Sequence, residues 1–128
     1  MSKNLLILDF GSQYTQLIAR RVRELNVYCE IHPFNKIPDG FNFDAVILSG
    51  SPCSVNQNDA PVAKLDSFDE NMPILGICYG AQFLVKDFGG VVESSNKREY
   101  GRANLSFVEN DNPLFKNIKS NSQVWMSH

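Results

Sequence analysis

Residues 73–90 read PILGICYGAQFLVKDFGG, and this stretch decides the fold. Its apolar residues 73–75 predict a short buried strand, and residues 81–88 predict a helix that ends at the following glycine pair. Only residues 76–80 separate the two elements. A tight turn from strand to helix is typical of α/β proteins, in which reactive groups lie at the carboxyl ends of the strands.

Gly76 and Gly80 flank Cys78 in a Gly-x-Cys-x-Gly pattern. Such a turn holds its central residue in strained dihedrals, and small neighbours let the backbone pass closely. The pattern places the sulfur of Cys78 at the N-terminus of the next helix, where partial positive charge favours a thiolate. It also aims the backbone N–H of Tyr79 at an oxyanion. We therefore interpret Cys78 as a nucleophile, although an inert buried cysteine is the commoner role for this residue type.

The same alternation of strand and helix runs through the preceding residues. Apolar runs predict three further buried strands, at residues 5–8, 27–31 and 45–48. A helical stripe predicts a helix over residues 14–25 with Ser12 as its N-cap, and Pro61 opens a short helix through residue 68. Weaker patterns predict short strands at residues 91–93, 103–108 and 123–126. Together these elements predict one α/β domain with an open, largely parallel sheet and helices on both faces.

The composition is that of an ordinary globular domain. Of the 128 residues, 43% are hydrophobic and 20% are charged, which excludes a disordered or fibrous chain. The net charge of -2 lacks the basic excess that nucleic acid binding requires. No apolar run approaches the roughly 18 to 20 residues of a membrane span. Three cysteines without an export signal predict free thiols in a cytoplasmic protein.

Two other strand ends are candidate parts of a site. Residues 49–52, Ser-Gly-Ser-Pro, could bring a second backbone donor towards Cys78, although a plain turn explains them equally well. Residues 9–13 lack the spaced glycines of a dinucleotide site, and the chain contains no Gly-Lys-Ser/Thr phosphate loop. Cys29 and Cys53 lack the glycine frame and are interpreted as structural, although Cys53 could also be an exposed thiol near the site. His32 is interpreted as a surface residue.

These motifs resemble those of class I glutamine amidotransferases. The resemblance to the family rests on residues 76–82 and 48–52. The match narrows to one member of that family through three further segments, residues 8–21, 98–101 and 124–128. It covers the whole chain and implies a flavodoxin-like fold. It further implies that Cys78 attacks the side-chain amide of glutamine, releasing ammonia from a thioester that is then hydrolysed to glutamate.

The resemblance implies roles for four more residues. Backbone N–H groups at Tyr79 and Ser51 would form the oxyanion hole, although Ser51 stands where the family usually has glycine. Gln82 would help to hold the glutamine substrate, and Ser127 would belong to the strand that binds its amino-acid end. No metal or cofactor is implied for these residues.

The resemblance also implies that residues 1–128 are an incomplete amidotransferase domain, truncated in its C-terminal part. The family's general base is a His followed two residues later by a Glu, in a segment beyond the motif of Trp125. This chain has only His32 and His128, and His128 matches a different motif. A separate synthetase domain, dependent on ATP and Mg²⁺, would use the ammonia, and oligomers could form through such absent domains.

Two alternatives stay open. The chain could be a folded but catalytically silent module of the same fold. It could also be an amidase or stress protein with a similar cysteine turn, but such proteins are not expected to contain the run at residues 9–21.

Overall fold

The computed structural model describes residues 3–69, 71–93, 100–105, 114 and 116–127. The chain divides into two compact units, Met1–Val92 and Glu93–His128. The first unit contains a four-stranded sheet and two α-helices, and the second contains a two-stranded sheet.

The sheet of the first unit consists of four parallel strands in the order β2-β1-β3-β4. They are β1 (Asn4–Asp9), β2 (Tyr28–Pro33), β3 (Ala45–Leu48) and β4 (Ile74–Gly76). The central strands β1 and β3 are apolar and buried, as expected for strands that are covered on both faces. The four strands predicted in this region are confirmed.

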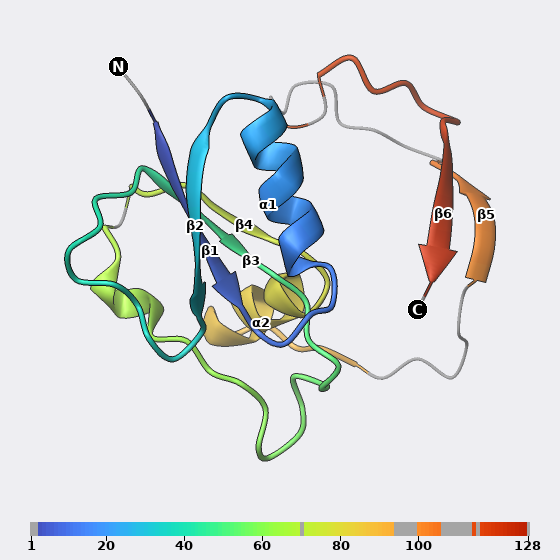
Figure 1. Ribbon diagram of the computed structural model, residues 1–128. Coiled ribbons are helices and arrows are strands. Elements are labelled where there is room, and N and C mark those ends of the chain that lie inside the picture. The colour runs from blue at the N-terminus through green and yellow to red at the C-terminus, as the bar shows by residue number, and fades with distance from the viewer. Residues whose placement is uncertain (1–2, 70, 94–99, 106–113, 115, 128) are drawn as a thin grey trace. The chain divides into compact units, whose positions relative to one another are not determined.

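One helix covers each face of this sheet, α1 (Thr15–Glu24) on one side and α2 (Tyr79–Asp87) on the other (Figure 1). The buried residues on the α1 side are Ile7, Ala19, Cys29 and Ile47. Those on the α2 side are Leu6, Leu8, Phe10, Val46, Leu48, Val55, Ala63, Tyr79 and Phe83. Neighbouring residues of β1 and β3 thus point to opposite faces. The predicted open parallel sheet with helices on both faces is confirmed.

The carboxyl ends of β1, β3 and β4 lie at one edge of the sheet. The register pairs Leu8 with Leu48, and Leu48 with Gly76. The three loops that the sequence singled out begin directly after these residues, so they are neighbours in space. This is the edge at which α/β proteins place their sites.

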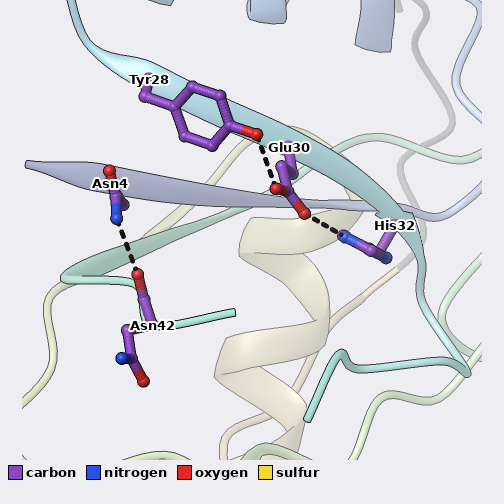
Figure 2. Close-up of polar contacts among 5 residues, drawn as sticks. All are labelled: Asn4, Tyr28, Glu30, His32 and Asn42. Carbon is purple, nitrogen blue, oxygen red and sulfur yellow. Dashed lines mark hydrogen bonds and ion pairs between the residues drawn. The ribbon is translucent and has the colours of Figure 1, made fainter. Parts of the chain in front are cut away.

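The edge strand β2 holds a line of polar side chains (Figure 2). The carboxylate of Glu30 accepts a hydrogen bond from the hydroxyl of Tyr28 at 2.7 Å and is paired with Nε2 of His32 at 2.9 Å. The bond from His32, followed by that from Tyr28, lowers the pKa of Glu30, and the bond to Glu30 raises the pKa of Tyr28. Nearby, Nδ2 of Asn4 donates to the carbonyl oxygen of Asn42 at 3.0 Å, which fixes the loop before β3 (Figure 2).

Four local predictions were wrong. The second strand continues to Pro33, because the last residue of an edge strand needs no N–H for the ladder. Residues 61–68 contain only a 3₁₀ turn, η1 (Leu65–Ser67), and residues 91–93 form no strand. Ser12 is not the N-cap of α1, since the helix begins after Tyr14 and the Oγ of Ser12 accepts the N–H of Tyr14 at 3.0 Å.

The second unit contains the antiparallel strands β5 (Tyr100–Asn104) and β6 (Gln123–Ser127). The strand predicted at residues 123–126 is confirmed. The strand predicted at residues 103–108 begins earlier, at Tyr100, and residues 106–108 lie outside the described residues.

Candidate active site

Cys78 occupies a sharp turn between β4 and α2. Its dihedrals are φ 53° and ψ −112°, and a positive φ of this kind costs a residue with a side chain about 1–3 kcal/mol. Glycines on both sides allow the turn: a Cβ on Gly76 would lie 2.6 Å from the backbone nitrogen of Ala81, and one on Gly80 would overlap the carbonyl oxygen of Leu48. The strained turn that the Gly-x-Cys-x-Gly pattern predicts is therefore present.

Hydrogen bonds fix this turn to the end of β3. The N–H of Ile77 donates to the carbonyl oxygen of Leu48 at 2.9 Å. The N–H of Gly80 donates to the carbonyl oxygen of Ser49 at 3.1 Å. Ser49 is fully buried, and its Oγ accepts the N–H of Phe10 at 3.1 Å. Ser49 thus ties the ends of β1 and β3 to the first turn of α2.

The first turn of α2 leaves one backbone donor available. The N–H groups of Ala81 and Gln82 both donate to the carbonyl oxygen of Cys78, at 3.0 and 3.1 Å, and that of Gly80 is bonded as described above. The N–H of Tyr79 has no acceptor among the described residues. A free N–H at a helix N-terminus is suited to bind negative charge.

The turn after β3 reaches the same point. A Cβ placed on the buried Gly50 would lie 3.6 Å from the Cβ of Cys78. The next residue, Ser51, is half-buried, and its Oγ accepts the N–H of Cys53 at 3.1 Å. Within the described part of the chain, the N–H of Ser51 itself has no acceptor. The predicted second donor is therefore on the residue after Gly50, which lies close to Cys78.

The side chain of Tyr79 anchors the turn in the core. It is 3% exposed, its ring centre lies 5.4 Å from that of Phe10, and its hydroxyl donates to the carbonyl oxygen of Pro61. Burial, followed by the nearby Cys53, raises the pKa of the Tyr79 hydroxyl. The ring therefore has a structural role, and the backbone N–H is the group available to a substrate.

Ser12, which the sequence interpretation did not assign to the site, also lies here. Its Cβ and Oγ are each 3.7 Å from the position of a Cβ on Gly50. The preceding Gly11 has φ 102°, and a Cβ on it would lie 3.4 Å from Cδ of Pro52, so the loop after β1 packs on the turn after β3. The sequence did hold a signal, because Ser12 follows a predicted strand, but serine is equally common in plain turns.

Fewer contacts define the positions of the other predicted site residues. Gln82 is exposed and lies one helical turn after Cys78, a spacing that puts two side chains on the same face of a helix. Ser127 belongs to β6 of the second unit, and His128 lies outside the described residues. Among the thiols, Cys29 is buried, Cys53 is half-buried and Cys78 is exposed.

His32 lies too far from Cys78 to act as its general base. The register aligns His32 with Leu8, Leu8 with Leu48, and Leu48 with Gly76. Three interstrand spacings of about 4.8 Å separate His32 from β4, or about 14 Å. The described residues thus contain no histidine beside the thiol, consistent with the prediction that His32 is not the base.

A cavity of about 340 Å³ adjoins the ring of Tyr79 but is not lined by Cys78. One of its lining residues, Lys86, already donates to the carbonyl oxygen of Val55 at 3.1 Å. The described residues contain no cluster of His, Cys, Asp and Glu suited to a metal ion. They also include no helix with the length and apolar character of a membrane span.

The sequence matches the family model of class I glutamine amidotransferases over residues 6–128. The chain belongs to this family. The resemblance drawn from the sequence motifs is thereby confirmed, and the turn of Cys78 has the strand-to-helix geometry that holds a nucleophile in such α/β folds.

Several relatives with curated names are GMP synthases. The chain is 63% identical to the GMP synthase [glutamine-hydrolyzing] of Christiangramia forsetii and 61% identical to that of Cytophaga hutchinsonii. Each alignment covers 100% of this chain and 25% of the relative, so the chain spans about a quarter of the length of these proteins.

Two solved structures have a similar fold. A Thermoplasma acidophilum protein described as a GMP synthase subunit superposes with a TM-score of 0.75 and 29% identity, covering 100% of this chain and 65% of that one. A glutamine amidotransferase from Thermotoga maritima superposes with a TM-score of 0.70 over 100% of this chain and 61% of its own, and at 19% identity it supports the fold alone.

Proposed function

We propose that this chain is the glutamine-hydrolysing part of a GMP synthase, with Cys78 as its nucleophile. One observation supports this most strongly. Cys78 is exposed on a strained turn, the next backbone N–H is free, and Gly50 lies beside it. A thiol next to free backbone donors is the arrangement that acyl transfer requires.

In the proposed reaction, the thiolate of Cys78 attacks the amide carbon of the glutamine side chain and forms a C–S bond. The electron pair of the C=O bond moves to oxygen, and the N–H groups of Tyr79 and Ser51 donate to this oxyanion. Collapse restores the C=O bond, breaks the C–N bond and releases ammonia as the nitrogen takes up a proton. Water then hydrolyses the thioester to glutamate and regenerates the thiol. Gln82 and Ser127 would bind the substrate.

The proton transfers need a base, and His32 is about 14 Å away by strand spacing. We assign this role to a His and Glu pair outside residues 1–128. On this account the 128 residues are an incomplete amidotransferase domain.

We assign the use of the ammonia to a separate synthetase domain that converts XMP to GMP with ATP and Mg²⁺. The sequence contains no Gly-Lys-Ser/Thr phosphate loop, and the described residues contain no cluster of His, Cys, Asp and Glu suited to a metal ion. The three free thiols fit a cytoplasmic enzyme, and contacts that form oligomers would lie in the domains outside this chain.

A silent module is the second candidate, and the distance of His32 from Cys78 favours it for residues 1–128 in isolation. Loss of a base typically lowers the rate by several orders of magnitude. An ammonia assay tests this directly. Robust glutaminase activity of isolated residues 1–128 would contradict our assignment of the base.

The experiment that tests the proposal is the substitution Cys78→Ala in the protein at its full natural length. We expect GMP synthesis from glutamine to be abolished and synthesis from added ammonia to be retained. Loss of both activities, or retention of both, would overturn the proposal.

A further inference from the structure

We propose that the hydroxyl of Ser12 is a further substrate-binding group of this site and donates a hydrogen bond to the oxygen of the amide that Cys78 attacks. The inference rests on the proposed hydrolysis of glutamine. It adds a side-chain donor from the loop after β1 to the backbone donors of the other two loops.

The position of Ser12 supports this role. A Cβ placed on Gly50 would lie 3.6 Å from the Cβ of Cys78 and 3.7 Å from the Oγ of Ser12, so both side chains border the same position. Gly50 is buried, whereas Cys78 is exposed and Ser12 is half-buried, so the two side chains beside Gly50 are both accessible to a ligand. Ser12 and Cys78 therefore both lie next to Gly50, on the loops after β1 and β4.

The loop that holds Ser12 is fixed by several contacts. Oδ1 of Asp9 accepts the N–H of Gly11 at 2.8 Å and the hydroxyl of Thr15 at 3.2 Å. Thr15 is buried, and the carbonyl oxygen of Ser12, at 3.3 Å from the same hydroxyl, is an alternative acceptor for its single proton. A donor held in this way loses little conformational entropy when it binds a substrate.

The hydroxyl of Ser12 has a proton to donate. Its oxygen accepts the N–H of Tyr14 at 3.0 Å, and no acceptor for its proton lies among the described residues. An amide NH₂ group offers protons, so the natural acceptor on a primary amide is its oxygen. That oxygen becomes more negative as Cys78 attacks, and a fixed donor therefore binds the transition state more strongly than the substrate.

The test compares three variants in the protein at its full natural length. Ser12→Ala removes the donor, Ser12→Thr retains a hydroxyl, and Ser54→Ala is the matched control. The Oγ of Ser54 accepts the N–H of Asn56 at 3.3 Å, which is the same kind of turn as at Ser12, and Ser54 is exposed. For each variant we would measure kcat and KM for glutamine and the rate at which iodoacetamide alkylates Cys78.

We expect Ser12→Ala to lower kcat/KM for glutamine on the order of 100-fold, mainly through kcat, as loss of an oxyanion donor does elsewhere. Ser12→Thr should restore most of this activity, and Ser54→Ala should leave it unchanged. Alkylation by iodoacetamide, which needs no oxyanion donor, should proceed at the same rate in all of them.

Three results would overturn the inference. One is a Ser12→Ala variant as active as the unsubstituted protein, and another is equal loss in Ser12→Ala and Ser12→Thr. The third is slower iodoacetamide alkylation in Ser12→Ala, because this would show a damaged turn. An unsubstituted protein that does not hydrolyse glutamine would refute the proposed function itself, and the role of Ser12 with it.

Discussion

The backbone N–H of Gly80 donates to the carbonyl oxygen of Ser49 at 3.1 Å, and this bond joins the turn of Cys78 to the turn after β3. The first turn of α2 lies so close to β3 that a Cβ on Gly80 would overlap the carbonyl oxygen of Leu48. The distance between the Tyr79 and Ser51 donors therefore depends on a glycine at position 80.

Gly80→Ala should destabilise the protein by about 1–3 kcal/mol or more, because the backbone of α2 must move away from β3. Gly40→Ala is the control, since a Cβ there meets nothing within 4 Å. Urea unfolding measures the free energy of unfolding of both variants. Equal stability of Gly80→Ala and Gly40→Ala would show that α2 does not pack as described.

Cys78→Gly should be more stable than Cys78→Ala by about 1 kcal/mol, since glycine adopts φ 53° without the strain of a Cβ. Both variants lack the thiol, so their difference reports the strain of a Cβ at this φ less the extra chain entropy that glycine loses on folding. Thermal and urea unfolding of the pair supply the measurement. A Cys78→Ala variant at least as stable as Cys78→Gly would argue against a strained turn.

Tyr79→Phe should distinguish the structural role of the Tyr79 side chain from the proposed catalytic role of its backbone N–H. The variant loses the hydrogen bond to the carbonyl oxygen of Pro61 and leaves that acceptor unpaired, which should lower the free energy of unfolding by about 1–3 kcal/mol. Glutamine hydrolysis by the full-length protein should change only slightly, because the N–H of residue 79 remains. A large fall in kcat with unchanged stability would place the phenol in the chemistry instead.

His32→Ala should raise the pKa of Glu30, because the hydrogen bond from His32 is the main cause of its lowered value. NMR titration of the Glu30 carboxyl carbon measures the shift. Because the pKa of Glu30 in the folded protein is below the ordinary pKa of glutamate, the pair stabilises the fold at every pH above that ordinary pKa. The stabilisation is lost as the pH falls through the pKa of Glu30 in the folded protein. An unchanged titration in His32→Ala would contradict the bond drawn in Figure 2.

The sheet was predictable from the sequence because its four strands are short apolar runs that turn residues end. The turn of Cys78 was equally predictable, since only glycine at positions 76 and 80 permits it. The expected helix at residues 61–68 was wrong, because the buried Ala63 packs in the core without a helical stripe around it. Ser12 was missed because Gly50, the residue beside it in the fold, lies 38 positions further along the sequence. No local sequence pattern predicts that two such distant residues are neighbours.

The central claim is that Cys78 is a nucleophile in a site that binds glutamine. The most direct measurement compares the alkylation of Cys78, Cys53 and Cys29 by a glutamine-mimicking electrophile and by iodoacetamide, using peptide mass mapping of the full-length protein. Iodoacetamide reports the exposure and thiolate reactivity of each cysteine without recognition of glutamine, and Cys29 is buried.

Our account predicts that the mimic prefers Cys78 over Cys53 far more strongly than iodoacetamide does, and that excess glutamine suppresses this preference. The same ratio of Cys78 to Cys53 labelling with both reagents, insensitive to glutamine, would contradict it.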